Sequence, residues 1–130
     1  MVLADVIEHI PNPAPLMRQL SALLAPDGVV LVSTPNVAFG AVRLALLAGR
    51  FDYVSSGILE RTHLRFFTRS TLQALVAESG YHLRTLGLCM RDPLSSEIDV
   101  FRDLPFMPGA VVRLALDRSA HVYQFLLELE

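Results

Sequence analysis

Residues 2–33 carry a strand, a helix and a second strand in succession, and this restricts the possible folds more than any other feature. Val29–Val32 is a continuous run of β-branched residues and leucine, which is typical of a strand covered on both faces. The short apolar run Val2–Ala4 predicts an earlier strand. An apolar stripe at helical spacing lies between them, formed by Leu16, Leu20, Leu23 and Leu24. Two strands joined through a helix predict parallel pairing and a right-handed crossover.

Turn and capping residues set the expected helix limits. Asn12 is the expected N-cap of the first helix, Pro13 its first residue, and the turn 26–28 (Pro-Asp-Gly) its end. A second helix is expected from Asn36 or Val37 to Ala48. A capping box at 70–73 (Ser-Thr-Leu-Gln) predicts a third helix, with Gly80 just beyond its end. This third helix would bury one face formed by Leu72, Leu75 and Val76.

The second half of the chain predicts two more strands. Tyr81–Met90 has the composition of a strand, and a short helix is expected over Ala110–Leu116. Tyr123–Leu129 alternates between an aromatic and apolar face and a mixed face, which is the period of a strand.

Composition excludes several classes of protein. We expect one domain over residues 1–130, and the net charge of −2 argues against a nucleic-acid-binding groove. Cys89 is the single cysteine, which indicates a reducing compartment. The longest apolar stretch, Val37–Gly49, contains Arg43 and is shorter than the roughly 20 residues that cross a bilayer. With no signal peptide in view, we expect a cytoplasmic protein without a transmembrane segment.

Several motifs together resemble the second half of a class I S-adenosylmethionine-dependent methyltransferase. They are the D-x-x-E-H-I-x-N-P run at 5–13, L-x-P-D-G at 24–28 and S-T-P-N at 33–36. G-R-F-D-Y at 49–53 followed by T-H-L-R-F-F-T at 62–68 is similar to the bacterial branch of ubiquinone and menaquinone O-methyltransferases, and to methyltransferases of cell-surface sugars.

The resemblance implies an α/β fold, namely part of a Rossmann-like methyltransferase sheet flanked by helices. The family sheet has the strand order 3-2-1-4-5-7-6, with strand 7 antiparallel. The strands expected here, in chain order, would be strands 4, 5, 6 and 7, at Val2–Ala4, Val29–Ser33, Tyr81–Met90 and His121–Leu129. They would be neighbours in the order 4-5-7-6, without the amino-terminal half of the sheet.

The family's usual cofactor-binding motifs are missing from this sequence. The glycine-rich turn after strand 1 and the acidic residue closing strand 2 would precede Met1, and no G-x-G-x-x-G occurs. Leu3, Ala4 and Asp5 would line the methionine side of S-adenosylmethionine, because ligands bind beyond the carboxyl ends of parallel strands. We therefore expect the chain to need a partner. An uncovered strand at Val2–Asp5 would recruit either a second copy, giving a homo-oligomer, or a separate amino-terminal half.

Asp5, Glu8 and His9 form the first group of candidate site residues. If a helical turn starts at Asp5, the three side chains share one face and could bind a divalent ion such as Mg²⁺, as the resemblance to quinone-type relatives also implies. Alternatively, Asp5 caps the turn and Glu8 is solvated. His9 is a candidate catalytic base for removing the acceptor proton, or a structural histidine bonded to a loop carbonyl.

Arg61, His63 and Arg65 form a second group, in a loop without clear periodicity. They could build a lid over the acceptor, with His63 as a second catalytic base and an arginine holding an anionic group. Alternatively, the arginines pack on phenylalanines and bond acidic neighbours such as Glu60. Asn36 could cap the next helix or contact the substrate.

The sequence therefore predicts a methyltransferase that transfers a methyl group to an oxygen or nitrogen of a quinone precursor, a sugar or another small molecule. As an isolated chain it would be incomplete. The alternative is a non-catalytic binding or assembly module derived from such an enzyme.

Overall fold

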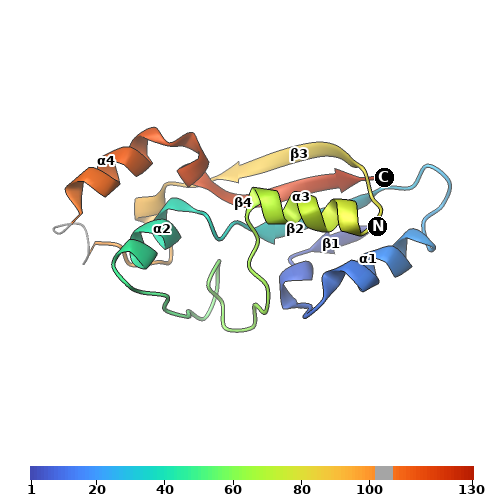
Figure 1. Cartoon of the computed structure of the whole chain (residues 1–130), viewed down its shortest axis with the longest axis horizontal. Helices are drawn as coiled ribbons and strands as arrows, with labels where there is room; N and C mark the ends of the chain where they lie inside the picture. Colours follow the sequence, from blue (N-terminus) through green and yellow to red (C-terminus); the bar gives the residue numbers. More distant parts are fainter. Residues whose placement is uncertain (102–106) are drawn as a thin grey trace.

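A four-stranded sheet forms the centre of the computed structural model, which describes residues 1–101 and 107–130 (Figure 1). The strands are β1 (Val2–Ala4), β2 (Val30–Pro35), β3 (Leu83–Met90) and β4 (Val122–Leu129). Their spatial order is β1-β2-β4-β3; β1 and β2 are parallel, and β4 is antiparallel to β2 and β3. The predicted order 4-5-7-6 and the predicted α/β fold class are both confirmed.

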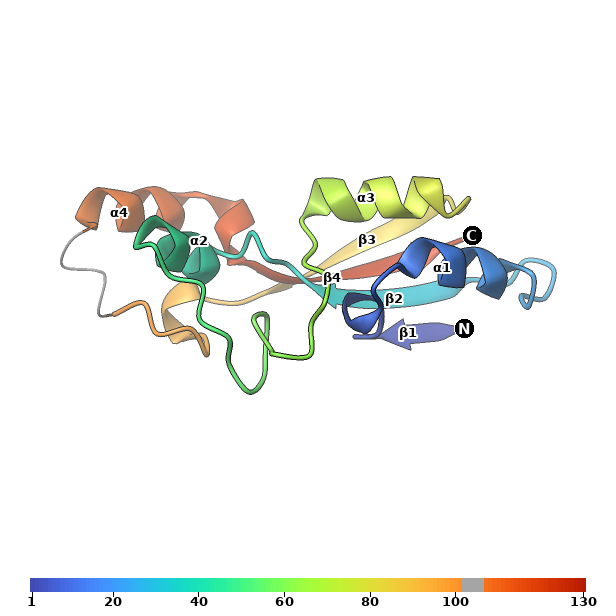
Figure 2. The ribbon, with the colours of Figure 1, turned by 60° about the horizontal axis from the view of Figure 1, so that its bottom comes forward.

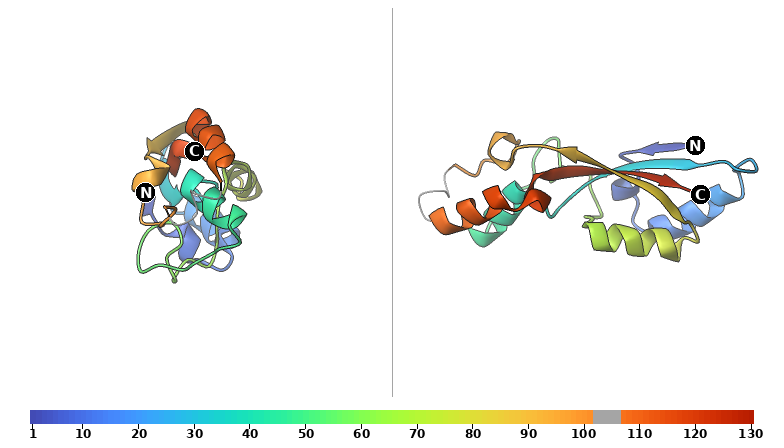
Figure 3. Two further views of the ribbon diagram at one scale, coloured as in Figure 1. Left: turned by 90° about the vertical axis from the view of Figure 1, so that its left-hand side faces the viewer. Right: turned by 90° about the horizontal axis from the view of Figure 1, so that it is seen from above.

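Helices α1 (Pro13–Ser21) and α3 (Arg69–Glu78) lie on the same side of this sheet (Figures 2 and 3). The predicted buried face of α3 is confirmed, since Leu72, Leu75 and Val76 are all buried. From β2 and β4, the core receives alternate side chains: Val30, Val32, Phe125, Leu127 and Leu129. The period of two expected for the last strand is therefore confirmed.

A second apolar cluster lies beyond the end of β2, around α2 (Gly40–Leu47) and α4 (Pro108–Leu116). Phe39, Ile58 and Leu59 are almost completely buried in it. Figure 1 shows α2 and α4 at one end of the molecule, away from α1 and α3. The short helices η2 (Pro93–Ser95) and η4 (Arg118–His121) connect this region to β3 and β4.

The opposite face of the sheet is open within the part of the chain that the structure describes. Val2, Leu31 and Leu126 are 66%, 45% and 43% exposed on it. Together with Ala4 and Gly87 they line a shallow apolar hollow of about 420 Å³. The prediction that the second strand is covered on both faces is therefore wrong. Its inner residues pack under α1 and α3, but Leu31 faces outward.

Three predicted helix limits are also wrong. Helix α1 ends at Ser21, because Leu23 closes a tight turn by bonding Leu20 O and leaves its side chain 73% exposed. The capping box of α3 is formed by Thr68 and Thr71, two residues earlier than predicted. Helix α2 begins at Gly40, after the N-cap residue Phe39, since Asn36 bonds to another strand. Gly80 follows α3 with φ of +80°, as predicted for a residue just beyond a helix end.

None of the described helices is long and apolar enough to span a membrane.

Candidate functional site

The carboxyl end of β1 leads into a tight turn that is held against β2. Asp5 has φ of +51°, and its backbone N–H donates to Ser33 O at 3.2 Å. Its Oδ1 accepts hydrogen bonds from Ser33 Oγ at 3.0 Å and Gln124 Nε2 at 2.6 Å. The following three-residue helix, η1 (Ile7–His9), has Val6 as its N-cap and no side-chain cap. Both expectations for Asp5, a helical turn starting there and a side-chain cap, are therefore wrong.

Glu8 is buried directly behind this turn, with an exposure of 1%. Thr34 Oγ1 donates to Glu8 Oε2 at 3.2 Å, and among the described residues Glu8 Oε1 has no hydrogen-bond partner. Burial raises the pKa of the Glu8 carboxyl group above its ordinary value. The alternative of a solvated Glu8 is wrong, because the residue lies between β2 and the loop that carries His63.

His9 and His63 lie beside Glu8, with their ring centroids 4.8 Å apart and the rings at 72°. His9 Nδ1 lies 3.1 Å from Thr62 O, and His63 Nδ1 lies 2.9 Å from Ile58 O. A carbonyl oxygen can only accept, so both Nδ1 atoms must carry the proton, and both Nε2 atoms keep a lone pair in the neutral rings. The expected contact of His9 with a loop carbonyl is confirmed.

Glu8, His9 and His63 together bring one carboxylate oxygen and two imidazole nitrogens within 4.8 Å of one another. These are three acceptors with no donor between them, so a cation, either a proton or a metal ion, would stabilise the cluster. Two imidazoles and one carboxylate suit Zn²⁺ and similar transition metals, whereas Mg²⁺ prefers oxygen ligands. The donor set therefore does not fit Mg²⁺. Asp5, predicted as a ligand, is not in the cluster because its carboxylate bonds Ser33 and Gln124.

The loop over residues 50–68 covers this cluster and is tied to the turn beneath it. The backbone N–H groups of Leu64 and Arg65 donate to Glu8 O at 2.8 and 2.9 Å. Arg65 Nε also donates to Pro11 O at 2.6 Å. Glu60 accepts a hydrogen bond from Thr62 Oγ1 at 2.6 Å, and among the described residues its carboxylate does not bond an arginine, unlike the alternative interpretation.

Arg61 faces an aromatic hollow rather than the histidine pair. It lines a cavity of about 500 Å³ together with Phe51, Asp52 and Tyr53. Phe51 contacts Tyr53 and Phe66 edge to face, with ring centroids 5.6 and 5.4 Å away. The loop therefore presents one guanidinium group beside a set of aromatic rings.

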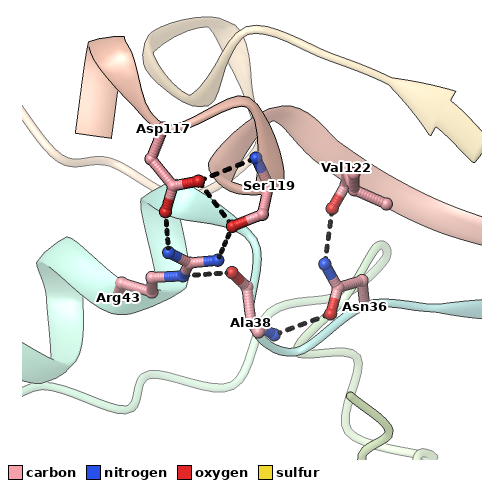
Figure 4. Close-up of polar contacts among 6 residues, drawn as sticks. All are labelled: Asn36, Ala38, Arg43, Asp117, Ser119 and Val122. Atoms are coloured by element: carbon pink, nitrogen blue, oxygen red, sulfur yellow. Dashed lines mark hydrogen bonds and ion pairs between the residues drawn. The ribbon is translucent and has the colours of Figure 1, made fainter. Parts of the chain in front are cut away.

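Asn36, after β2, uses its side chain within the protein (Figure 4). Its Nδ2 donates to Val122 O at 2.7 Å, and its Oδ1 accepts from the N–H of Ala38 at 3.0 Å. Asn36 is 3% exposed, and it does not cap α2. Its role is to fix the end of β2 to the start of β4.

Leu3, Ala4 and Asp5, the expected cofactor wall, lie at the sheet edge in different surroundings. Leu3 packs against the core under α1, whereas Ala4 lines the open apolar hollow. Asp5 is engaged with Ser33 and Gln124.

Thr34, Ser33 and Gln124 hold the two carboxylates in place and were not singled out from the sequence. The available signal was weak. The two hydroxyl residues end a strand that is otherwise apolar, and such strand ends are where sites form in parallel sheets.

Comparison with known proteins places these features in a family. The model of a methyltransferase domain matches residues 1–86. Ubiquinone biosynthesis O-methyltransferase of Parvibaculum lavamentivorans is 26% identical over 115 residues, which cover 87% of this chain and 45% of that protein. The enzyme of the same name from Chromobacterium violaceum is 33% identical over 85 residues, or 64% of this chain and 36% of the relative. The chain thus spans less than half the length of these curated relatives.

A solved structure is similar in fold. It belongs to a provisionally named methyltransferase of Bacillus halodurans, with a TM-score of 0.52 and 16% identity. The match covers 98% of this chain and 64% of that one. At this level of identity the likeness concerns the fold.

Proposed function

The chain belongs to the methyltransferase domain family, and from this we propose that it forms the carboxyl-terminal, acceptor-binding half of an S-adenosylmethionine-dependent O-methyltransferase. S-adenosylmethionine is the cofactor expected of this family. The observation that carries the proposal is the Glu8–His9–His63 cluster at the carboxyl end of β1, in which Glu8 and His63 are buried and His9 is partly exposed. This position lies beyond the strand ends, where α/β sheets bind their ligands.

His9 is the proposed catalytic base. His9 is more exposed than His63, which is 7% exposed, and its Nδ1 is fixed by Thr62 O. Its Nε2 can accept the proton of an acceptor hydroxyl group as the oxygen attacks the methyl carbon that the cofactor supplies. When bound, S-adenosylmethionine would supply the methyl group, and its sulfur would keep the electron pair of the carbon–sulfur bond as S-adenosylhomocysteine. His63 packs edge-on against His9 and would position it, and Glu8 would stabilise the imidazolium that forms.

A phenolic acceptor is the proposed substrate class. The hollow beside Arg61 offers Phe51 and Tyr53, against which an aromatic ring can pack. Arg61 could bind an acidic substituent of that ring, and Arg65, anchored on Pro11 O, would hold the loop in place. The names of the similar ubiquinone biosynthesis enzymes support a quinone precursor over a sugar. They also give no support to the alternative of a non-catalytic module.

We also propose that the donor site is completed by a partner, namely an amino-terminal half or a second copy. Strand β1 has a neighbour on one side only in the described sheet, β2, so its other edge is open. The adjacent sheet face exposes Val2, Leu31 and Leu126. Both surfaces are costly to leave in water, and a further strand with a covering helix would bury them.

Two measurements test this function. Calorimetry with S-adenosylhomocysteine on the isolated chain should give binding no tighter than about 1 mM, roughly −4 kcal/mol; binding tenfold tighter would contradict the incomplete donor site. With the donor site completed by the partner, methyl transfer to phenolic acids at saturating cofactor should fall by about 10²-fold or more in His9→Ala. Arg113→Gln, an exposed arginine on α4, is the matched control. An unchanged rate in His9→Ala would remove His9 as the base.

A further inference from the structure

A further cavity lies on the α3 side of the sheet, separate from the Glu8 cluster. Its volume is about 680 Å³, within the usual range for small-molecule sites. The start of α3, η4 and the outer part of β3 surround it. None of the residues that line this cavity belongs to the Glu8–His9–His63 cluster, so the cavity is separate from the proposed acceptor site.

Three arginines line this cavity, and no acidic residue does: Arg43, Arg69 and Arg118. Arg43 is neutralised, since its Nη1 pairs with Asp117 Oδ2 at 2.7 Å and its Nη2 donates to Ser119 Oγ at 3.0 Å (Figure 4). Its Nε donates to Ala38 O. The negative charge of Asp117 therefore compensates Arg43 and neither of the other two arginines. Among the described residues, the side chains of Arg69 and Arg118 make no hydrogen bond or ion pair, so the rim carries two uncompensated positive charges.

The position of Arg69 adds to this imbalance. It is the first residue of α3, whose first turn contains no acidic residue. The amino end of a helix carries a partial positive charge, so a cation there is unfavourable and an anion is favourable. Ser70 and Gln73, from the first two turns of the helix, also line the cavity and offer neutral hydrogen-bond donors. A bound anion would relieve the repulsion between Arg69 and the helix end.

The floor of the cavity is apolar, and two of its side chains are exposed to solvent. Leu88 and Met90, on the edge strand β3, are 45% and 56% exposed, and both line the cavity beside Val122 and Phe125. Exposed apolar side chains under a rim of positive charge complement a molecule with an apolar body and an anionic head. An inorganic anion alone would leave the leucine and methionine in water.

We propose that this cavity binds a small amphipathic anion, a phosphate or carboxylate group joined to an alkyl or aryl body. Arg69 and Arg118 bind the head, with the start of α3, and Leu88 and Met90 contact the body. The site is distinct from the methyl-transfer site and does not depend on it.

Calorimetry with octyl phosphate and octanoate, each below its micelle concentration, tests the proposal on the whole chain. Both should bind with submillimolar affinity, and octanol and inorganic phosphate at least tenfold more weakly. Arg69→Gln and Arg118→Gln should each weaken octyl phosphate about tenfold, because each removes a charge-assisted hydrogen bond. Leu88→Asn should weaken octyl phosphate and leave inorganic phosphate unchanged.

The matched control is Arg113→Gln, which removes an exposed arginine on α4 that does not line the cavity. Circular dichroism and thermal melting verify that each variant is folded. Octanol binding as tightly as octyl phosphate would overturn the proposal. So would octyl phosphate affinities that are the same in Arg69→Gln, Arg118→Gln and Arg113→Gln.

Discussion

Thr34 Oγ1 lies 3.2 Å from Glu8 Oε2, so a hydroxyl group at the end of β2 binds one oxygen of a buried carboxyl group that follows β1. The other oxygen, Oε1, is buried and has no hydrogen-bond partner among the described residues. Burial without a full set of partners disfavours the charged form of Glu8, which is why its pKa is raised.

Glu8→Gln should make folding less sensitive to pH. The pKa of Glu8 is raised in the folded state, so its contribution to stability is fully present below the ordinary value of 4.5 and is lost as the pH rises through the folded value. The glutamine side chain stays neutral, and its amide N–H can donate to Nε2 of a neighbouring histidine. At pH 7 the Glu8→Gln variant should therefore be more stable than the wild type, with a free energy of unfolding about 1 kcal/mol higher.

Urea unfolding at pH 4, 5.5 and 7 measures this difference, with Glu78→Gln, an exposed glutamate on α3, as the control. A Glu8→Gln variant that is less stable than the wild type at pH 7 would show that Glu8 is ionised and held by a cation.

His63→Ala should destabilise the fold more than His9→Ala. His63 is buried and donates from Nδ1 to Ile58 O, so the alanine variant loses a hydrogen bond and leaves a cavity, at a cost of about 2 kcal/mol. His9 is less buried, and its bond to Thr62 O is exposed to solvent. Urea unfolding of both variants gives the comparison. Equal losses would contradict the structural role given to His63.

Asp117→Asn should weaken the junction between α2 and η4 in a pH-dependent way. Hydrogen bonds from Ser119, and then the pairing with Arg43, lower the pKa of Asp117 from 3.8 to about 2. This stabilisation is present above pH 3.8 and is lost as the pH falls through about 2. The wild type should therefore be more stable than the variant at pH 5, and the two should converge near pH 2.

Acid unfolding followed by circular dichroism tests this, with Asp27→Asn as the control, because the Asp27 carboxyl group has no hydrogen bond or ion pair among the described residues. A constant difference across this pH range would contradict the assignment.

Leu126→Glu should reduce self-association. Leu126 is 43% exposed on the open sheet face beside Leu31, and a charge there would oppose burial against a second copy. Sedimentation velocity at increasing concentration should show the wild type associating and the variant remaining monomeric. Leu116→Glu, at an 81% exposed position on α4, is the control. A wild type that is monomeric throughout would contradict association through this face.

The sequence was sufficient for features that depend on local patterns. The alternation in β4 and the glycine after α3 were both predictable, because neighbouring residues decide them. The strand order followed from the resemblance to a family. The surroundings of Glu8 were not predictable, because its partners Thr34 and Leu64 are 26 and 56 positions away, which local spacing cannot reveal.

The start of α2 was missed for a similar reason. Asn36 has the composition of a helix cap, but a bond to Val122, 86 positions later, takes its amide group. The Mg²⁺ site failed because it assumed a continuous helical turn, whereas Asp5 adopts a left-handed conformation and its carboxylate bonds to Ser33 and Gln124.

The hydrogen bonds between the 50–68 loop and the turn after β1 have one more consequence. Thr62 O holds His9, and Glu8 O holds the N–H groups of Leu64 and Arg65. These hydrogen bonds hold His9 and the 50–68 loop together. Swinging this segment outward would therefore either break the hydrogen bond to His9 or move the histidine with it.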